Sequence, residues 1–127
     1  MKTFAASLIA ATAVAGFSPL EDLPFPDVNA FEEKLFTNKI DHFDFQDDRT
    51  YQQSYWVSDE YWTNHDSPNF IYICGEYRCS VPDFRWYPFM LGADVGARLF
   101  VLEHRFYGSS QPFEDWETPN LKYLSSE

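Results

Sequence analysis

The chain has 127 residues, of which 45% are apolar and 20% aromatic, and twenty acidic residues face nine basic ones, for a formal charge of −11. One ordinary domain fits this length, and so many bulky apolar side chains exclude a disordered chain. The negative charge disfavours binding to nucleic acid or to an anionic membrane surface, because both carry the same sign.

The first fifteen residues have the features of a secretory signal peptide. Lys2 provides a positive start, an uncharged stretch runs from Phe4 to Val14, and small residues precede Gly16. We therefore expect cleavage after residue 15 and passage through the secretory pathway, to the cell exterior or a lysosome. A buried N-terminal helix is the alternative, which Gly16 and the prolines beyond it oppose. Residues 16–34, rich in proline at their start, are expected to be an extended leader.

Two stretches of alternating polarity predict an antiparallel hairpin. The first is "IDHFDF" from Ile40, the second is "TYQQSYWVS" from Thr50, and the polar "QDDR" between them is the expected turn. Side chains alternate between the two faces of a strand. One face of the second strand therefore collects Tyr51, Gln53, Tyr55 and Val57.

Two continuous apolar runs, "NFIYIC" at 69–74 and "ARLFVLEHR" at 97–105, predict strands that are covered on both faces. The connection between them is long enough for parallel strands and for a short crossover helix over 86–93. Pro88 is compatible with that helix only in its first turn. The sequence thus predicts an α/β fold, in which an antiparallel hairpin is followed by a parallel βαβ unit.

The predicted sheet is incomplete. Its two apolar strands need further neighbours, and the turn-rich "GSSQPFEDWETPNLKYLSSE" that follows provides no strand. Ser125 or Ser126 followed by Glu127 is typical of the beginning of a helix. We therefore expect the N-terminal part of a larger fold.

The two cysteines, Cys74 and Cys79, are expected to form a disulfide, because secretory compartments are oxidising. A loop this small is stabilised by about 2 kcal/mol in the chain-entropy model. The alternative is a metal site that includes His65 or His104, but the second cysteine pair typical of zinc sites is missing. We expect no metal and no cofactor.

The stretch "LEHRFYGSSQPF" contains a carboxylate, an imidazole and two hydroxyls, and so invites a catalytic interpretation. Glu103 and His104 are adjacent, however, and point to opposite faces if the strand continues through them. Glu103 and Arg105 would share a face, where they can pair with each other or cap loops. Ser109 and Ser110 lack the G-x-S-x-G pattern of a hydrolase nucleophile. We expect a structural role for this cluster.

Taken together, these segments resemble the N-terminal part of the prolylcarboxypeptidase family of serine peptidases, which includes a lysosomal dipeptidyl peptidase and a thymus-specific serine protease. The resemblance covers about residues 35–127, expected to be a fragment of the peptidase domain. Its motifs are "IDHFDF", "TYQQSYWV", the Gly75-Glu76 turn and "EHRFYGSSQPF". The last motif is a strand-end motif with Glu103, His104, Arg105, Tyr107 and Gly108.

The resemblance implies an α/β-hydrolase fold with an inserted cap domain, and hydrolysis of peptide bonds next to proline by a Ser, Asp and His triad. All three triad residues follow the region matched here, so the chain contains no catalytic residue of the family and is expected to be inactive alone. The substrate of the parent enzyme would be a peptide. Carboxypeptidase or dipeptidyl peptidase activity and the oligomeric state, a dimer included, stay open.

One functional element of the parent enzyme is a candidate in this chain. In α/β-hydrolases the loop after the third strand provides a backbone N–H to the oxyanion hole. The resemblance places Gly75, Glu76 and Tyr77 in that loop. Cys74, Tyr77 and Arg78 depart from the turn usual in the family, and a plain turn held by the disulfide is the alternative.

Two other functional readings stay open. The chain could be a complete small secreted binding module that stacks sugars or prolines on its tryptophans, or a decayed relative without catalysis. The predicted βαβ unit opposes a carbohydrate-binding module, which is normally all-β. The tryptophans in question are Trp56, Trp62, Trp86 and Trp116.

Overall fold

The structure is a computed structural model that describes residue 22 and residues 25–81 and 87–124. Several expected features lie outside the described residues: the predicted signal peptide, most of the predicted leader up to residue 24, Trp86, and the helix start expected at residues 125–127.

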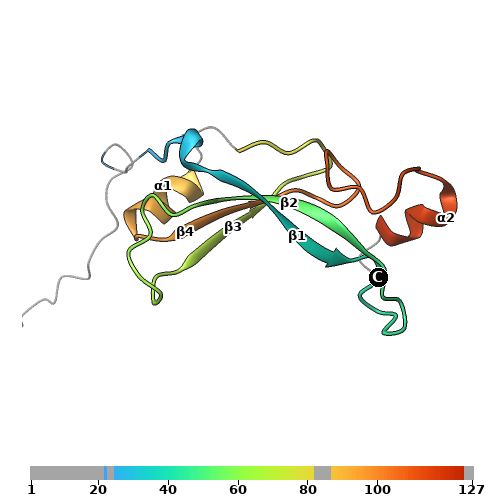
Figure 1. The fold of residues 1–127 in the computed structure, drawn as a ribbon. Coiled ribbons are helices and arrows are strands. Elements are labelled where there is room, and N and C mark those ends of the chain that lie inside the picture. The colour runs from blue at the N-terminus through green and yellow to red at the C-terminus, as the bar shows by residue number, and fades with distance from the viewer. Residues whose placement is uncertain (1–21, 23–24, 82–86, 125–127) are drawn as a thin grey trace, which may run out of the picture.

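The described chain forms one four-stranded mixed sheet (Figure 1). The strands are β1 (Glu32–Lys39), β2 (Thr50–Ser58), β3 (Asn69–Ile73) and β4 (Arg98–Leu102), in the spatial order β1-β2-β4-β3. β1 and β2 are antiparallel, β2 and β4 are antiparallel, and β3 and β4 are parallel. The helices are α1 (Tyr87–Asp94) and α2 (Thr118–Leu121), with short 3-10 turns at Val28–Ala30 and Lys122–Leu124. This architecture is compatible with the predicted partial α/β domain.

The hairpin is present, but its first strand was placed wrongly. β1 occupies Glu32–Lys39 and so begins within the last three residues of the expected leader, and residues 40–49 form the connection to β2. The Asp41 carboxylate accepts hydrogen bonds from the amides of Phe43 (2.8 Å) and Asp44 (3.0 Å). Such local bonds from an aspartate offer the backbone an alternative to a strand, and they override the alternating pattern.

The parallel βαβ unit is confirmed. β3 and β4 pair in parallel with Phe70 opposite Leu99, and α1 lies between them in the chain. The helix begins at Tyr87, so Pro88 occupies its first turn, where the missing N–H has no helical partner to lose.

The core lies on one face of the sheet, under α1 (Figure 1). Phe89 of the helix packs against Leu99 and Val101 of β4, and these three side chains are 0–1% exposed. At β3 the opposite face is open, contrary to the prediction of strands covered on both faces. Ile71 and Ile73 of β3 are 63% and 62% exposed. A continuous apolar run indicates that both faces of a strand are suited to burial. It does not indicate that the described residues supply the side chains that cover both faces.

No helix within the described ranges is both long and apolar enough to cross a membrane.

Candidate functional site at the carboxyl ends of the parallel strands

Two loops leave the sheet where the parallel strands end. The first, Cys74–Cys79, follows β3, and the second, Glu103–Ser110, follows β4. In open α/β sheets, ligands bind beyond the carboxyl ends of the strands. These loops are therefore where a site built on this sheet is to be sought.

The disulfide between Cys74 and Cys79 is confirmed, with the two Cα atoms 5.8 Å apart. Both cysteines are buried, and the Cys74 amide continues the strand pairing by donating to the carbonyl of Leu102 at 2.9 Å. Because both sulfurs are in the disulfide, neither is a thiolate that could bind a metal. Within the described ranges, no three His, Cys, Asp or Glu side chains gather as a metal site would require.

The three candidate oxyanion residues lie inside this disulfide loop. The Tyr77 amide donates to the carbonyl of Gly75 at 2.8 Å, so that N–H is occupied by the turn itself. The amides of Gly75 and Glu76 make no hydrogen bond within the part of the chain that the structure describes. Glu76 is exposed. The loop therefore has uncommitted amides at the sheet edge, and their catalytic role stays a prediction.

The Tyr77 ring packs over the loop. A Cβ atom at Gly75 would lie 2.9 Å from Cε1 of Tyr77, so the absence of a side chain there permits the contact. The Tyr77 hydroxyl lies 2.8 Å from that of Tyr72 on β3. The pKa of Tyr72 is raised, mainly by this hydrogen bond.

Glu103 is the centre of the second loop and is 1% exposed. Its Oε2 accepts hydrogen bonds from the amide (3.1 Å) and hydroxyl (3.1 Å) of Ser109 and from the amide (3.1 Å) and hydroxyl (2.8 Å) of Ser110. Its Oε1 accepts one from the Cys79 amide at 3.1 Å. The carboxylate thereby ties the disulfide loop to the loop after β4.

Of the two structural roles expected for Glu103, the structure shows the second. The side chain caps loops, but no ion pair with Arg105 is present within the described residues. The pairing was expected from strand alternation, which does not apply because β4 ends at Leu102. The Arg105 Nη2 instead donates to the carbonyls of Ile40 (2.8 Å) and Lys39 (3.2 Å).

The remaining strand-end residues have structural contacts. Gly108 has φ +52°, and a Cβ atom there would collide with Oε1 of Glu103. The His104 Nδ1 lies 2.8 Å from the carbonyl of Arg105, and its ring packs edge-on against Tyr107. Phe106, 2% exposed, also has a positive φ of +70°, a conformation that costs about 1–3 kcal/mol in a bulky residue.

Neither serine of this loop has the surroundings of a nucleophile. Ser110 is 0% exposed, so a peptide cannot reach its hydroxyl. The Ser109 hydroxyl donates to Glu103 and lies 2.8 Å from that of Ser54. The sequence suggested a structural cluster here, but missed that the Glu103 carboxylate accepts hydrogen bonds from both serines. The proximity of Gly108 and two serines to an acidic residue was the available signal.

Comparison with known proteins places this geometry in a family. The family model "Serine carboxypeptidase S28" matches residues 38–127. The protein named "Probable serine protease EDA2" of Arabidopsis thaliana is 41% identical over 96 residues, which are 74% of this chain and 19% of that protein. The human thymus-specific serine protease is 39% identical over 88 residues, 68% of this chain and 17% of that protein. The mouse lysosomal Pro-X carboxypeptidase is 31% identical over 122 residues, 88% of this chain and 24% of that protein.

The matched sequence is therefore that of a serine peptidase family. The chain belongs to the serine carboxypeptidase S28 family, which confirms the resemblance read from the sequence. It spans between 17% and 24% of the length of these three relatives.

Proposed function

We propose that the chain is the N-terminal part of a serine-type exopeptidase that cleaves peptides next to proline in the secretory pathway, outside the cell or in a lysosome. The observation that carries this proposal is the family match over residues 38–127. The lysosomal Pro-X carboxypeptidase and the thymus-specific serine protease among the relatives support the peptidase class and the compartment.

The open side of the sheet supports the view that this chain is part of a larger domain. Among the described strands, β3 lies at the end of the sheet with one edge unpaired, and Ile71 and Ile73 expose more than half of their surface. Parallel strands are ordinarily covered on both faces, and exposed apolar patches mark surfaces that contact other elements. Additional polypeptide of the same domain would cover this face.

In such an enzyme, the part contributed by this chain would be an oxyanion-hole amide. The loop between β3 and α1 has the position from which an α/β-hydrolase donates one N–H to the oxyanion. The uncommitted amides of Gly75 and Glu76 supply donors there. The charge that develops on the carbonyl oxygen in the transition state would be stabilised by this donor, because it is oriented before the reaction begins.

The nucleophile, acid and base would come from other polypeptide. No G-x-S-x-G occurs in the 127 residues, and the serines of the strand-end loop are held by Glu103. The chain by itself should therefore hydrolyse no peptide. Detection of proline-directed hydrolysis by the pure chain would contradict the proposal.

The decisive experiment is to sequence the transcript beyond the codon for Glu127. We expect an in-frame continuation that encodes G-x-S-x-G followed by an Asp and a His. A fluorophosphonate, which labels activated serines, should then mark a protein longer than this chain in the source cells. A stop codon at that position, with a soluble and cooperatively unfolding product, would favour the small binding module instead.

A further inference from the structure

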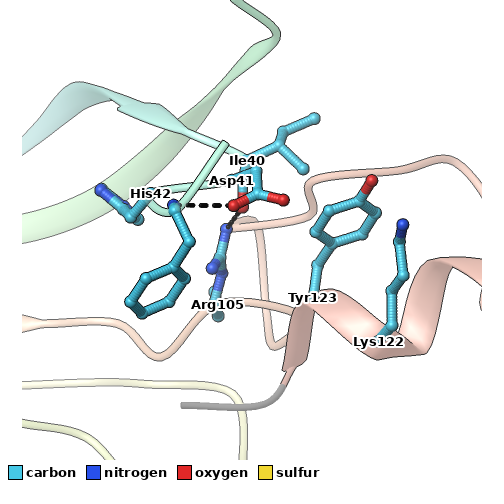
Figure 2. Close-up of a pocket in the computed structure, with 7 residues that line it drawn as sticks. Ile40, Asp41, His42, Arg105, Lys122 and Tyr123 are labelled. Atoms are coloured by element: carbon cyan, nitrogen blue, oxygen red, sulfur yellow. Dashed lines mark hydrogen bonds between the residues drawn. The ribbon is translucent and has the colours of Figure 1, made fainter. Parts of the chain in front are cut away.

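A pocket of about 260 Å³ lies between the connection that follows β1 and the helical turn near the end of the described chain (Figure 2). Figure 2 shows Arg105 rising toward Ile40 and Asp41, with Tyr123 and Lys122 on the neighbouring helical segment. We call it the Arg105 pocket. Its lining residues are Ile40, Asp41, His42, Phe43, Arg105, Lys122 and Tyr123.

The pocket and the candidate oxyanion loop lie at the same end of the sheet, where β1, β3 and β4 finish. β1 runs parallel to β4 because each is antiparallel to β2, so the carboxyl ends of β1, β3 and β4 share one edge. Arg105 follows β4 and contacts the carbonyl of Ile40, which follows β1. Ligands of α/β sheets bind beyond this edge.

Arg105 has donor capacity that the protein does not use. A guanidinium has five N–H donors and keeps its charge at every accessible pH. Nη2 donates to the carbonyls of Ile40 and Lys39, and the group lies 5.4 Å from the centre of the Tyr51 ring. Nε is buried and has no hydrogen-bond partner within the described residues. A buried donor without a partner is costly, and such a group calls for an acceptor.

The charges around the pocket favour an anion. Arg105 and Lys122 form no ion pair within the described residues, although the whole chain has a formal charge of −11. Lys122 Nζ instead lies 4.6 Å from the centre of the Tyr123 ring. Asp41 is the one carboxylate of the lining, and two backbone amides hold it. The negative charge of Asp41 disfavours binding of a dianion more than binding of a monoanion.

Besides these charged groups, the lining has the polar ring of His42 and three largely apolar side chains. Ile40 is 4% exposed, and Phe43, which is 70% exposed, lines the pocket as well. The Tyr123 ring adds a third apolar surface. A ligand that matches this lining has one carboxylate next to an apolar group. Phosphate and other polyanions match it less well.

We propose that the Arg105 pocket binds the carboxylate of a peptide C-terminus, with the apolar terminal side chain against Phe43 and Tyr123. Carboxylate recognition rests on the pocket alone. The choice of a peptide as its source rests on the proposed function. A parent enzyme with this pocket would read the carboxyl end of its substrate, as a carboxypeptidase must.

The test is direct binding to the 127-residue chain, followed by chemical shift changes in its amide NMR spectrum. The probe is N-acetyl-alanyl-phenylalanine with a free carboxylate, and the comparison is the same peptide as a C-terminal amide. We expect the acid to bind at least about fivefold more tightly, and to weaken as salt rises from about 0.05 M to about 0.5 M. Shifts should centre on residues 40–43 and 122–123.

Two variants and one control assign the site. Lys122→Gln should weaken binding of the acid by about three- to tenfold, the effect of one exposed charge, and Arg105→Gln by more. Lys34→Gln is the matched control, because Lys34 pairs with Glu32 on β1, outside the pocket. The Lys34→Gln variant should bind the peptide acid with unchanged affinity. Because Arg105 also ties two loops together, the Lys122 variant decides the matter if Arg105→Gln does not fold.

Four results would each overturn the proposal or part of it. One is equal binding of the acid and the amide, and another is the same affinity in Lys122→Gln as in the unsubstituted chain. Tighter binding of alanyl-phenylalanine amide, whose free ammonium would pair with Asp41, would assign the pocket to the opposite end of a peptide. Acetate binding as tightly as the peptide acid would overturn the peptide as the source. Because hydrolysis is not measured, these results are independent of whether the proposed peptidase activity is found.

Discussion

The backbone amide of Cys79 donates a hydrogen bond of 3.1 Å to Oε1 of Glu103, so a buried carboxylate joins the two loops at the carboxyl ends of β3 and β4. The other oxygen of the same carboxylate holds the two serines that close the loop after β4. The shape of the candidate oxyanion loop therefore depends on a residue that lies 24 positions from the nearest cysteine. The predictions below begin with this residue.

Removing the Glu103 carboxylate should destabilise the chain strongly. Glu103→Ala leaves five buried or partly buried donors without their acceptor, and we expect a loss of about 3 kcal/mol or more in the free energy of unfolding. Urea denaturation followed by tryptophan fluorescence measures it. Glu33→Ala, on the exposed side of β1, is the control and should change stability by less than about 0.5 kcal/mol. Equal losses in the two variants would refute the role of the network.

Gly108→Ala should be destabilising for two separable reasons. The positive φ of +52° disfavours any side chain, and the added Cβ would collide with Glu103 Oε1. We expect a loss of about 2–3 kcal/mol. In a Glu103→Ala background the collision is gone, so the further loss from Gly108→Ala should fall to about 1 kcal/mol. A double-mutant cycle in urea tests this coupling, and additive losses would contradict it.

The Asp47–Arg49 pair should make the hairpin connection sensitive to acid. The hydrogen bonds from the Arg49 side chain and amide hold the pKa of Asp47 down at about 2. A carboxyl group with a lowered folded pKa stabilises the fold above its unfolded pKa of about 3.9, and this stabilisation is lost as the pH falls toward 2. In Asp47→Asn, the urea midpoint should therefore fall less steeply between about pH 5 and about pH 2.

The size of that effect will be modest, because the Arg49 side chain is 53% exposed and salt screens its charge, although the Asp47 side chain is only 10% exposed. Asp48→Asn is the control, since Asp48 accepts no hydrogen bond within the described residues. Its pH dependence should follow that of the unsubstituted chain. A steeper loss of stability in acid for Asp47→Asn would show that the sign has been assigned wrongly.

The open sheet face should make the isolated chain prone to aggregate. Ile71 lies beside Phe36, Tyr55, Phe100 and Leu102 in an apolar groove on the face opposite α1. We expect Ile71→Lys to lower light scattering at a given protein concentration, because a charge interrupts the apolar surface. Phe45→Lys is the control, since Phe45 is 88% exposed but belongs to the β1–β2 connection. An equal benefit from both would show that the face has no special part in aggregation.

Local patterns were sufficient for several elements. The continuous apolar runs located β3 and β4, and the length of the connection between them predicted parallel pairing and α1. The second hairpin strand was located by its alternation. The first was misplaced because Asp41 closes a local turn within an alternating segment. Pairing of β2 with β4 was not predicted, since no local signal specifies which strands become neighbours across more than forty residues.

The sequence alone determined the family, the disulfide and the parallel βαβ unit, because motifs, cysteine count and apolar runs are properties of short segments. Only the tertiary structure decided what Glu103 contacts and which face of β3 stays open. A carboxylate finds its donors, and an apolar side chain its cover, among residues that are distant in the sequence. Such contacts depend on how the strands are ordered in space, and that order is a property of the whole chain.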